Sequence, residues 1–215
     1  MFHFTTRTEK STLQQQGQCV LDVSSRAPLP FRYLSPFYPH GHIPVRGMAG
    51  TTADSVEGVW QGPKLIQGAI DPTYFHGRCK KRRGKPTGHL YGTRVLTYQQ
   101  AQHLIYVSLY PWMVYHAPHA RDTALQLLRE GRHQDIFLHD VDTNGDIEDL
   151  TRPLAHAAVL VHILNENLAV LAQYETDTAF KQEYDADDAP GGMLAYPLED
   201  LLIQEGRGAS PPRAL

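Results

Sequence analysis

The sequence predicts a single, mainly helical α+β domain with a few short strands. Residues 97–109 and 119–129 carry apolar residues at helical spacing, and a strongly apolar stretch begins at Pro153, so helices are expected in all three places. Two short apolar runs, near 19–23 and over 135–141, predict strands. The alternation of these elements is typical of an α+β fold.

The composition is that of a folded protein without a large excess of charge. Hydrophobic residues make up 41% and charged residues 20%, and the formal net charge is -3, so no overall positive field favours nucleic acid. The cysteines, Cys19 and Cys79, lack the spacing of a redox or zinc motif, so a disulfide framework is not expected. No apolar run is long enough for a signal peptide or a membrane span. We therefore expect a cytoplasmic protein that does not associate with a membrane.

The first third of the chain is expected to be loosely structured before its first clear helix. Residues 1–30 are polar and predict a loose N-terminal arm, and residues 26–45 are rich in proline and aromatic residues, which predicts a loop. A helix is expected to start at Asp54, which has Glu57 at capping-box spacing. Gly62-Pro63 should end or kink it, because proline removes one backbone donor.

The middle of the chain combines a basic loop with a capped helix. Residues 76–94 are basic and rich in glycine, which predicts a loop. Thr97 and Gln100 have capping-box spacing and are expected to open a helix that Pro111 interrupts.

The domain is expected to cover residues 1–175. The helix that begins at Pro153 should run to about Leu168, with a weaker continuation to Gln173. Residues 176–215 are acidic and contain glycine and proline, and they are expected to be partly disordered at the end of the chain.

Three polar residues share one face of the helix expected from Asp54. Glu57, Gln61 and Lys64 are separated by four and three positions, and Trp60 lies beside them. A carboxylate, an amide and an ammonium next to an indole suit a polar ligand that contains a ring. The alternative is structural, with Glu57 as a helix cap and Trp60 as a core residue.

The same residues resemble a known signature. LSPFYPHGHIPV followed by SVEGVWQGPK is similar to the motifs of the NADAR superfamily, whose members are N-glycosidases that act on ribosylated substrates. The matching positions are Ser35 and Phe37 in the first segment and Ser55, Val56, Glu57, Gln61 and Lys64 in the second. A family of unknown function that shares SPFYPHG and SVEGxWQGxK resembles the chain over a longer stretch.

The chain departs from the NADAR pattern at three places. Pro36 replaces the asparagine of the family and Gly58 replaces its histidine. The family's C-terminal W-G-x-G segment is absent, and Gly92–Arg94 matches its L-G-R segment only loosely. The resemblance therefore rests on the first half of the chain.

An acidic turn follows the strand expected at 135–141. Asp140, Asp142, Asn144 and Asp146 fall at ligand positions of an EF-hand loop, but position twelve is Thr151 instead of glutamate and the preceding segment is strand-like. Calcium is therefore not expected, and turn and cap chemistry is the alternative. In an N-glycosidase, Asp142 or Asp146 would position water.

The basic loop and two histidine motifs contain residue types that can bind anions or metals. Lys80, Lys81, Arg82, Arg83 and Lys85 lie between glycines, an arrangement that suits phosphate but also occurs in solvated loops. The HGH and HAPH motifs lack a third placed ligand, so no metal is expected, and no cofactor is expected either.

The resemblance and the motifs together predict a site. The expected catalytic residues are Glu57, Lys64, Asp142 and Asp146, and the expected substrate-binding residues are Ser35, Phe37, Tyr38, His40, Ser55, Trp60, Gln61, Arg82, Arg83, Lys85 and Arg94. Lys64 or Gln61 would assist departure of the base, and Trp60 or Tyr38 would stack on the substrate. The expected partner is a ribosylated substrate, either a small molecule or carried on nucleic acid. A nucleotide or ADP-ribose binding module without turnover is the first alternative, and a calcium-dependent structural protein is the second.

Overall fold

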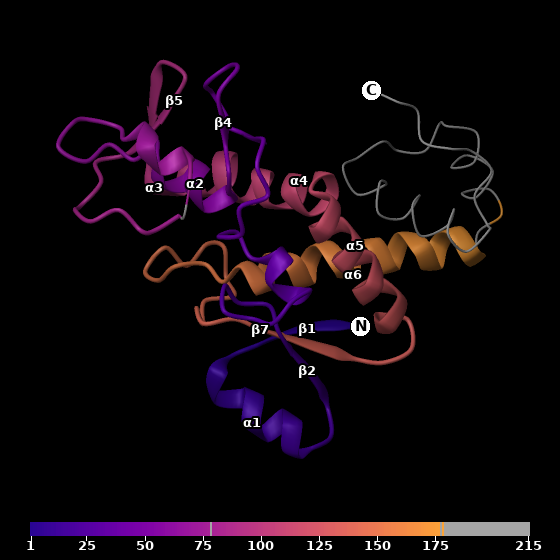
Figure 1. The fold of residues 1–215 in the computed structure, drawn as a ribbon. Coiled ribbons are helices and arrows are strands. Elements are labelled where there is room, and N and C mark those ends of the chain that lie inside the picture. Colours follow the sequence, from indigo (N-terminus) through magenta and orange to yellow (C-terminus); the bar gives the residue numbers. More distant parts are fainter. Residues whose placement is uncertain (78, 177, 179–215) are drawn as a thin grey trace.

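A parallel sheet joins the N-terminus to the middle of the chain. The computed structural model describes residues 1–77, 79–176 and 178 (Figure 1). Strands β1 (Phe2–Thr5) and β2 (Cys19–Asp22) both pair in parallel with β7 (Ile136–His139), which lies between them. The strands expected near 19–23 and 135–141 are thus confirmed, and the fold is mixed α+β.

The prediction of a loose N-terminal arm was wrong. Residues 1–22 form β1, helix α1 (Arg7–Gln15) and β2. Thr6 and Glu9 form a capping box at the start of α1. The backbone of Phe2 is held by the side-chain amide of Asn165, which accepts from its N–H at 2.9 Å and donates to its carbonyl at 2.8 Å. The capping box is local, but the contacts with Asn165 and the pairing with β7 join residues more than a hundred positions apart, which local sequence does not indicate.

One long helical segment forms an upper layer of the domain. It consists of α3 (Tyr98–Ala101), the π-helical turn η3 (Gln102–Val107) and α4 (Ser108–His116). Thr97 caps it as predicted, but Pro111 lies inside α4 and does not interrupt it. A proline ring crowds the carbonyl four residues before it, and for Pro111 that residue is Val107, the last of the π-helical turn.

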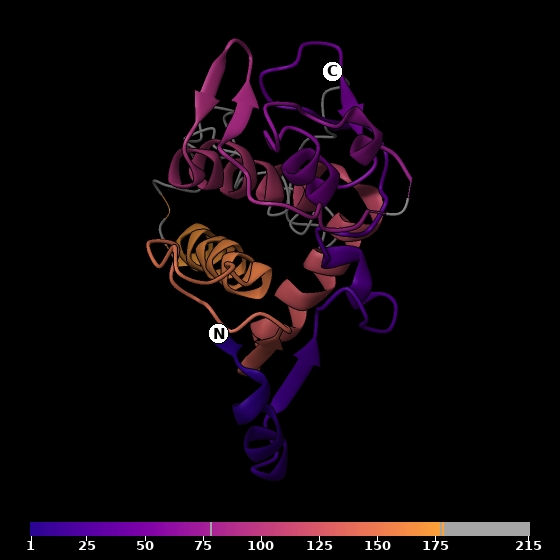
Figure 2. The ribbon, with the colours of Figure 1, turned by 90° about the vertical axis from the view of Figure 1, so that its left-hand side faces the viewer.

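Two further helices complete the core. Helix α5 (Pro118–Gly131) follows α4, and α6 (His156–Thr176) starts a few residues after the expected Pro153. In Figures 1 and 2, α6 lies between α4 and the three-stranded sheet. The buried side chains of these layers form one hydrophobic cluster. None of the helices in the described part of the chain has the length and apolar character needed to cross a membrane.

A third group of short elements surrounds helix α2 (Val56–Gln61). They are η1 (Phe31–Leu34), β3 (Ile43–Pro44), β4 (Thr52–Ala53), η2 (Pro72–Phe75), β5 (His89–Tyr91) and β6 (Arg94–Leu96). Strands β3 and β4 form one antiparallel pair, and β5 and β6 form another. The β5–β6 hairpin projects from the body of the molecule (Figure 2).

Helix α2 forms where the sequence predicts it, but its cap differs. Ser55 is the N-cap, and its Oγ accepts a hydrogen bond from the N–H of Gly58 at 3.1 Å. Asp54 instead accepts from the N–H of Gly77 at 2.6 Å, so the expected pairing of Asp54 with Glu57 as a capping box was wrong. Both Asp and Ser are good N-caps, and the helix begins at the second of them because Asp54 is used by another loop.

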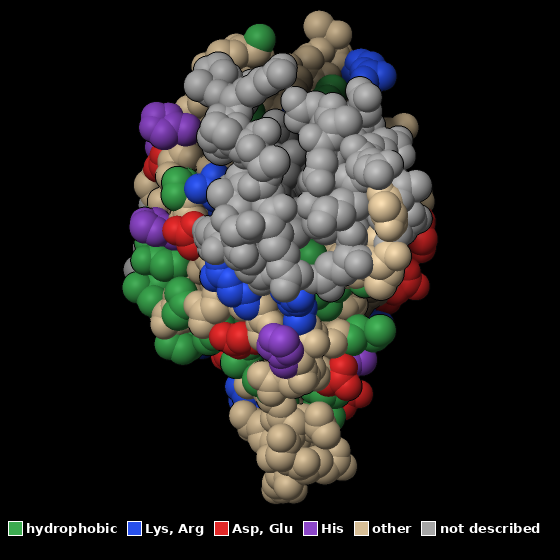
Figure 3. Space-filling view, turned by 90° about the vertical axis from the view of Figure 1, so that its right-hand side faces the viewer, with side chains coloured by type: hydrophobic (Ala, Val, Ile, Leu, Met, Phe, Trp, Pro, Cys, Tyr) green, Lys and Arg blue, Asp and Glu red, His purple; other side chains and the backbone are tan. Residues whose placement is uncertain are grey.

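The surface carries charges of both signs. On the face shown in Figure 3, lysine and arginine side chains of the described residues are interspersed with aspartate and glutamate side chains. This pattern fits the small formal net charge of -3. The C-terminal segment expected at 176–215 lies outside the described residues apart from Thr176 and Thr178.

Candidate functional site

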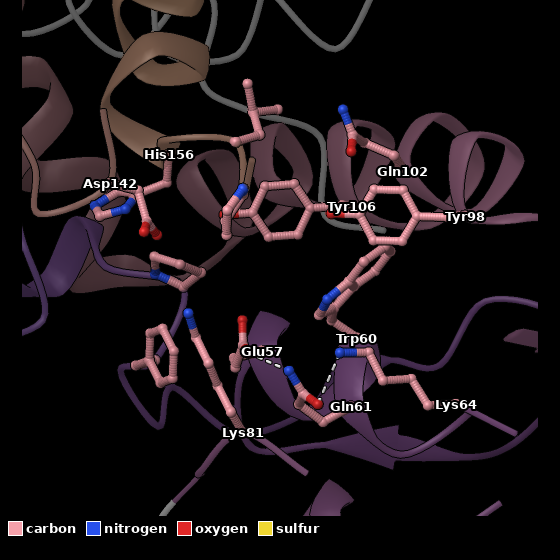
Figure 4. Close-up of a pocket in the computed structure, with 14 residues that line it drawn as sticks. Glu57, Trp60, Gln61, Lys64, Lys81, Tyr98, Gln102, Tyr106, Asp142 and His156 are labelled. Atoms are coloured by element: carbon pink, nitrogen blue, oxygen red, sulfur yellow. Dashed lines mark hydrogen bonds between the residues drawn. The ribbon is translucent and has the colours of Figure 1, made fainter. Parts of the chain in front are cut away.

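A pocket of about 270 Å³ opens between α2, the α3–η3 helix and the loop after β7. Figure 4 shows Glu57 and Gln61 on α2 and Lys64 just beyond its end, with Tyr98, Gln102 and Tyr106 across from them. The residues that line the pocket are Pro36, Phe37, Glu57, Trp60, Gln61, Lys64, Lys81, Tyr98, Gln102, Tyr106, Asp142, Pro153, Leu154 and His156.

A hydrogen-bonded relay runs from the end of α2 to Glu57. Nζ of Lys64 donates to Oε1 of Gln61 at 2.9 Å, and Nε2 of Gln61 donates to Oε1 of Glu57 at 2.6 Å. The four-residue spacing brings Glu57 and Gln61 together on the helix, as the sequence predicts. The prediction that Lys64 shares this helical face was wrong, because α2 ends at Gln61 and Lys64 pairs with His89 in a β-bridge beyond the turn at Gly62-Pro63. The relay connects a buried carboxylate to a half-buried ammonium.

The backbone around α2 fixes Glu57 in place. The N–H of Glu57 donates to the carbonyl of Pro36 at 2.8 Å, which joins the helix to the proline-rich loop. Next to it, a side-chain carbon added at Gly58 would lie 2.9 Å from the carbonyl oxygen of Tyr74. The glycine therefore allows α2 to pack closely against η2. Glu57, which precedes this glycine, is only 5% exposed.

Arg82 secures the end of α2 from the basic loop. Its N–H donates to Oε1 of Gln61 at 3.1 Å, and its guanidinium donates to the carbonyls of Gln61, Gly62, Lys64 and Ala69. A cation on the last carbonyls of a helix is favourable because those groups carry partial negative charge. Arg82 thus binds the chain's own backbone, and its predicted contact with a substrate phosphate finds no support in this arrangement.

Trp60 lies in a cluster of rings at the edge of the pocket. The rings of His89, Tyr98 and Tyr106 lie 4.3, 5.5 and 5.9 Å from it, and Nζ of Lys64 lies 5.3 Å from its centroid. Trp60 is 9% exposed, which confirms the prediction that it is mostly buried. Burial, followed by the charge of Lys64, lowers the pKa of His89 to about 4, so this ring is neutral.

The wall opposite α2 is built on the π-helical turn. Tyr98, Gln102 and Tyr106 recur every four residues and line the pocket together. Nε2 of Gln102 donates to the carbonyl of Ile147 at 2.7 Å, so this wall also holds the loop after β7. π-Helical turns are frequent at functional sites because they re-aim side chains within a helix.

The loop after β7 contributes a second carboxylate, Asp142, to the pocket. Contacts of residues on either side of Asp142 anchor this loop. Asn144 donates from Nδ2 to the carbonyls of Asp149 and Arg152 at 2.8 and 3.0 Å. Asp140 forms a buried ion pair with Nδ1 of His156 at 2.7 Å. These contacts hold Asp142 at the pocket although its own side chain is only partly buried.

His156 carries a proton on both ring nitrogens. Nε2 lies 2.8 Å from the carbonyl of Val23, which can only accept, and Nδ1 faces the carboxylate of Asp140. That carboxylate also accepts from the N–H of His156 and of Val141, and these hydrogen bonds with the charge of His156 outweigh burial and lower its pKa, which favours the ionised form. Burial lowers the pKa of His156, but the charge of Asp140 and these hydrogen bonds outweigh it, so the pKa is raised.

The two carboxylates of the pocket have altered acidity. Burial raises the pKa of Glu57, while the hydrogen bond from Gln61 and the charges of Lys64 and Lys81 oppose the increase. Burial also raises the pKa of Asp142, and the charge of Lys81 opposes it. The charge of Asp142 also raises the pKa of Glu57, and after burial the charges of both carboxylates raise the pKa values of Tyr98 and Tyr106. Such shifted values cluster at acid–base sites.

Six of the fifteen residues predicted for the site line the pocket. They are Phe37, Glu57, Trp60, Gln61, Lys64 and Asp142. Ser55 caps the start of α2 and Arg82 contacts its end from the basic loop, so neither lines the pocket. Ser35 is buried and accepts from the N–H of Phe37 at 3.3 Å, which shapes the loop before the pocket.

The other predicted residues lie outside the pocket lining. Tyr38 and His40 belong to a separate cluster of rings with Tyr33 and His119. Arg83, Lys85 and Arg94 are exposed, and Arg94 packs over Tyr91 in the β5–β6 hairpin. Asp146 is exposed and accepts from the N–H of Glu148 at 2.9 Å, in a local turn.

The polar side chains of the acidic turn stabilise the turn itself, which is the alternative to calcium binding that the sequence left open. Asp140, Asn144 and Asp146 are all used by backbone groups or by His156, and the preceding segment is the strand β7. Among the described residues, no cluster of three or more His, Cys, Asp or Glu side chains is arranged to hold a metal ion.

Sequence reasoning missed most of the far side of the pocket. The residues not predicted are Pro36, Lys81, Tyr98, Gln102, Tyr106, Pro153, Leu154 and His156. A signal was present for three of them, because Tyr98, Gln102 and Tyr106 form a polar and aromatic stripe at four-residue spacing. His156 reaches the pocket through long-range packing, which spacing cannot indicate.

Over residues 5–160, the chain matches the model of a family described as "Family of unknown function (DUF6939)". This range includes every residue that lines the pocket. No curated protein and no solved structure matches the chain.

Proposed function

The chain belongs to this family of unknown function, DUF6939, and we propose that its pocket is the active site of a NADAR-like N-glycosidase. The reaction would cleave the C–N glycosidic bond of a phosphoribosyl or ADP-ribosyl substrate. The observation that carries the proposal is Glu57, a buried carboxylate held by a relay inside a pocket that also contains Asp142 and several aromatic rings.

A fixed carboxylate suits this reaction. When the bond between the sugar carbon C1′ and the base breaks, positive charge develops on C1′ and on the ring oxygen. Glu57 would stabilise that charge more strongly than the neutral ground state, which lowers the barrier. Because Gln61 and Lys64 hold the carboxylate, little reorganisation would be needed during the reaction.

The second carboxylate would act on water. Asp142 lines the same pocket as Glu57, and burial raises its pKa, which favours a role as general base near neutral pH. The proton of the attacking water would pass to Asp142 as its oxygen bonds to C1′. In the relay, Lys64 and Gln61 would position the carboxylate of Glu57. This role replaces the one expected from the sequence, in which Lys64 or Gln61 assists departure of the base.

A binding module without turnover is the second candidate. Gly58 stands where the NADAR motif has a histidine, and its contact with Tyr74 leaves no room for a side chain. Pro36, which replaces the asparagine of the motif, accepts a backbone hydrogen bond from Glu57. A pocket that lost these two groups would still bind a ribosylated ligand.

Base release separates the two candidates. ADP-ribosylated guanosine and phosphoribosyl pyrimidines are incubated with the wild type, with Glu57→Gln and with Glu130→Gln, a control that removes a carboxylate from α5. We expect the wild type and the control to release the base, and Glu57→Gln to lose on the order of 100- to 1,000-fold in rate. Tight binding of ADP-ribose without release of any base would support the binding module instead.

The same assay identifies the carboxylate that acts on water. Asp142→Asn is expected to slow base release strongly, because Asp142 lines the pocket. Asp146→Asn tests the other carboxylate predicted from the sequence, which is exposed and points into a local turn. A larger effect of Asp146→Asn would contradict the assignment to Asp142.

A further inference from the structure

Three cationic side chains line the pocket, and the structure distinguishes their roles. They are Lys64, Lys81 and His156. A group that protonates a departing base must have a proton that is not committed to the protein's own hydrogen bonds. The partners of each cation therefore decide which of them can act.

Lys64 is committed to the relay. Its Nζ donates to Gln61 and lies over the ring of Trp60. Moving it toward a substrate would leave Oε1 of Gln61 with only the N–H of Arg82 and would weaken the support of Glu57.

His156 has no available proton. Both of its ring N–H groups already donate, one to Asp140 and the other to the carbonyl of Val23. Its imidazolium can therefore contribute only its charge to the pocket.

Lys81 differs from both. It is an exposed residue of the basic loop whose amine points into the pocket, on the side of Glu57 and Asp142 (Figure 4). Its ammonium group forms no hydrogen bond or ion pair with any residue in the described part of the chain. Its charge acts on both carboxylates, since it opposes the effect of burial at each of them.

The loop is fastened next to this residue. Arg82, which follows Lys81 directly, is tied to the end of α2 through its backbone N–H and its guanidinium. The backbone of Lys81 is thus held at the pocket, while its side chain keeps the freedom to follow a substrate.

We propose that Lys81 is the general acid that protonates the departing base. This proposal rests on the proposed N-glycosidase function and extends it, because it assigns the step that the relay residues cannot perform. Lys81 would contact the base directly and is therefore a catalytic residue.

The proton balance closes within the pocket. The C1′–N bond breaks and its electron pair stays with the base nitrogen, which takes a proton from the ammonium of Lys81. Water then adds its oxygen to C1′ and gives a proton to Asp142. Transfer of that proton from Asp142 to the neutral amine of Lys81 restores both groups, and the net reaction is hydrolysis of the glycosidic bond.

The first test does not depend on turnover. The pKa values of the Glu57 and Asp142 carboxyl groups are measured by ¹³C NMR in the wild type, in Lys81→Met and in Lys10→Met, a control on α1. Loss of Lys81 should raise both pKa values, and loss of Lys10 should change neither. Unchanged values in Lys81→Met would overturn the placement of the amine between the two carboxylates, whether or not the protein is an enzyme.

The second test uses the leaving group. Lys81→Met should slow release of a neutral purine or pyrimidine base by on the order of 100-fold or more. Its loss on a pyridinium N-riboside should be much smaller, because that leaving group already carries the positive charge and needs no proton. An equal loss on both substrates would overturn the role as general acid.

The two tests separate this proposal from the proposed function. If the wild type cleaves no riboside while the carboxyl pKa values rise in Lys81→Met, the glycosidase function is wrong, and with it the assignment of Lys81 as a general acid. If the wild type cleaves ribosides and Lys81→Met is unaffected on every substrate, only the assignment of Lys81 is wrong.

Discussion

Gln61 donates a hydrogen bond from Nε2 to Oε1 of Glu57 at 2.6 Å, and its orientation is fixed by two donors on the other side of the amide. Oε1 of Gln61 accepts from Nζ of Lys64 at 2.9 Å and from the N–H of Arg82 at 3.1 Å. Because both partners of that oxygen can only donate, the NH₂ group must face Glu57. The amide therefore links the cation to the carboxylate in a single direction.

Replacing Gln61 with methionine tests the relay. Methionine has a similar length but no hydrogen-bonding amide, so Glu57 loses its donor and Lys64 loses its acceptor. A buried polar group left without a partner costs about 1–3 kcal/mol, and we expect the free energy of unfolding in urea to fall by that amount. The pKa of Glu57 should rise further. Gln126→Met on α5 is the control, and an equal effect of both changes would contradict a specific role for the relay.

Arg82 and its neighbour Arg83 form a natural pair of variants. Arg82 donates to four backbone carbonyls around the end of α2, whereas Arg83 is exposed. Lysine cannot reproduce the planar, multidentate contacts of a guanidinium. Arg82→Lys should lower the free energy of unfolding by about 1–3 kcal/mol, and Arg83→Lys should change it by less than about 0.5 kcal/mol. Equal stability of the two variants, measured by urea denaturation, would show that the clamp contributes little.

The half of the site on α2 could be predicted because it depends on local spacing. Glu57 and Gln61 are four residues apart, so any helix over this stretch brings them together. Lys64 follows the end of α2 and reaches Gln61 from beyond the turn at Gly62-Pro63, which helical spacing does not predict. The end of the helix at Gly62-Pro63 is likewise local, since proline removes a donor wherever it stands. These features need no knowledge of the rest of the fold.

The other half of the site depends on contacts that local sequence does not encode. Asp142 reaches the pocket because Asp140 pairs with His156 and because Gln102 holds the loop at Ile147. The N-terminal strand pairs with β7, more than a hundred residues away. The contacts of Arg82 with the end of α2 could not be predicted either, since a basic residue in a loop looks the same whether it binds phosphate or backbone carbonyls.

The cap of α2 gives a third prediction. Ser55→Ala removes the oxygen that accepts from the N–H of Gly58, and loss of an N-cap costs about 0.5–2 kcal/mol. We expect the melting temperature to fall by about 2–4 °C for each kcal/mol lost in a protein of this size. Ser25→Ala, at an exposed position before the proline-rich loop, should leave the melting temperature unchanged. A normal melting temperature for Ser55→Ala would indicate that another group replaces the cap.

The last prediction concerns the pH dependence of the ion pair between Asp140 and His156. The pair is buried, and removing one partner from such a pair typically costs 3–5 kcal/mol, so His156→Gln should be strongly destabilised near pH 6.

The pH dependence follows from the two pKa values. The pKa of His156 is raised above 6.5 in the folded protein, so its contribution to stability is complete below pH 6.5 and is lost as the pH rises through the folded pKa. For Asp140, burial raises the pKa but the charge of His156 outweighs it, so the pKa is lowered below 3.8 and this contribution is lost only in stronger acid. The difference in unfolding free energy between wild type and His156→Gln is measured in urea from acid to alkaline pH. It should be largest between pH 3.8 and pH 6.5 and shrink at alkaline pH. His162→Gln, which changes an exposed histidine on the same helix, should cost much less stability, because its ion pair with Glu166 is exposed to solvent. A difference for His156→Gln that stays constant at alkaline pH would mean that the ring is neutral in the folded protein and that its charge does not hold Asp140.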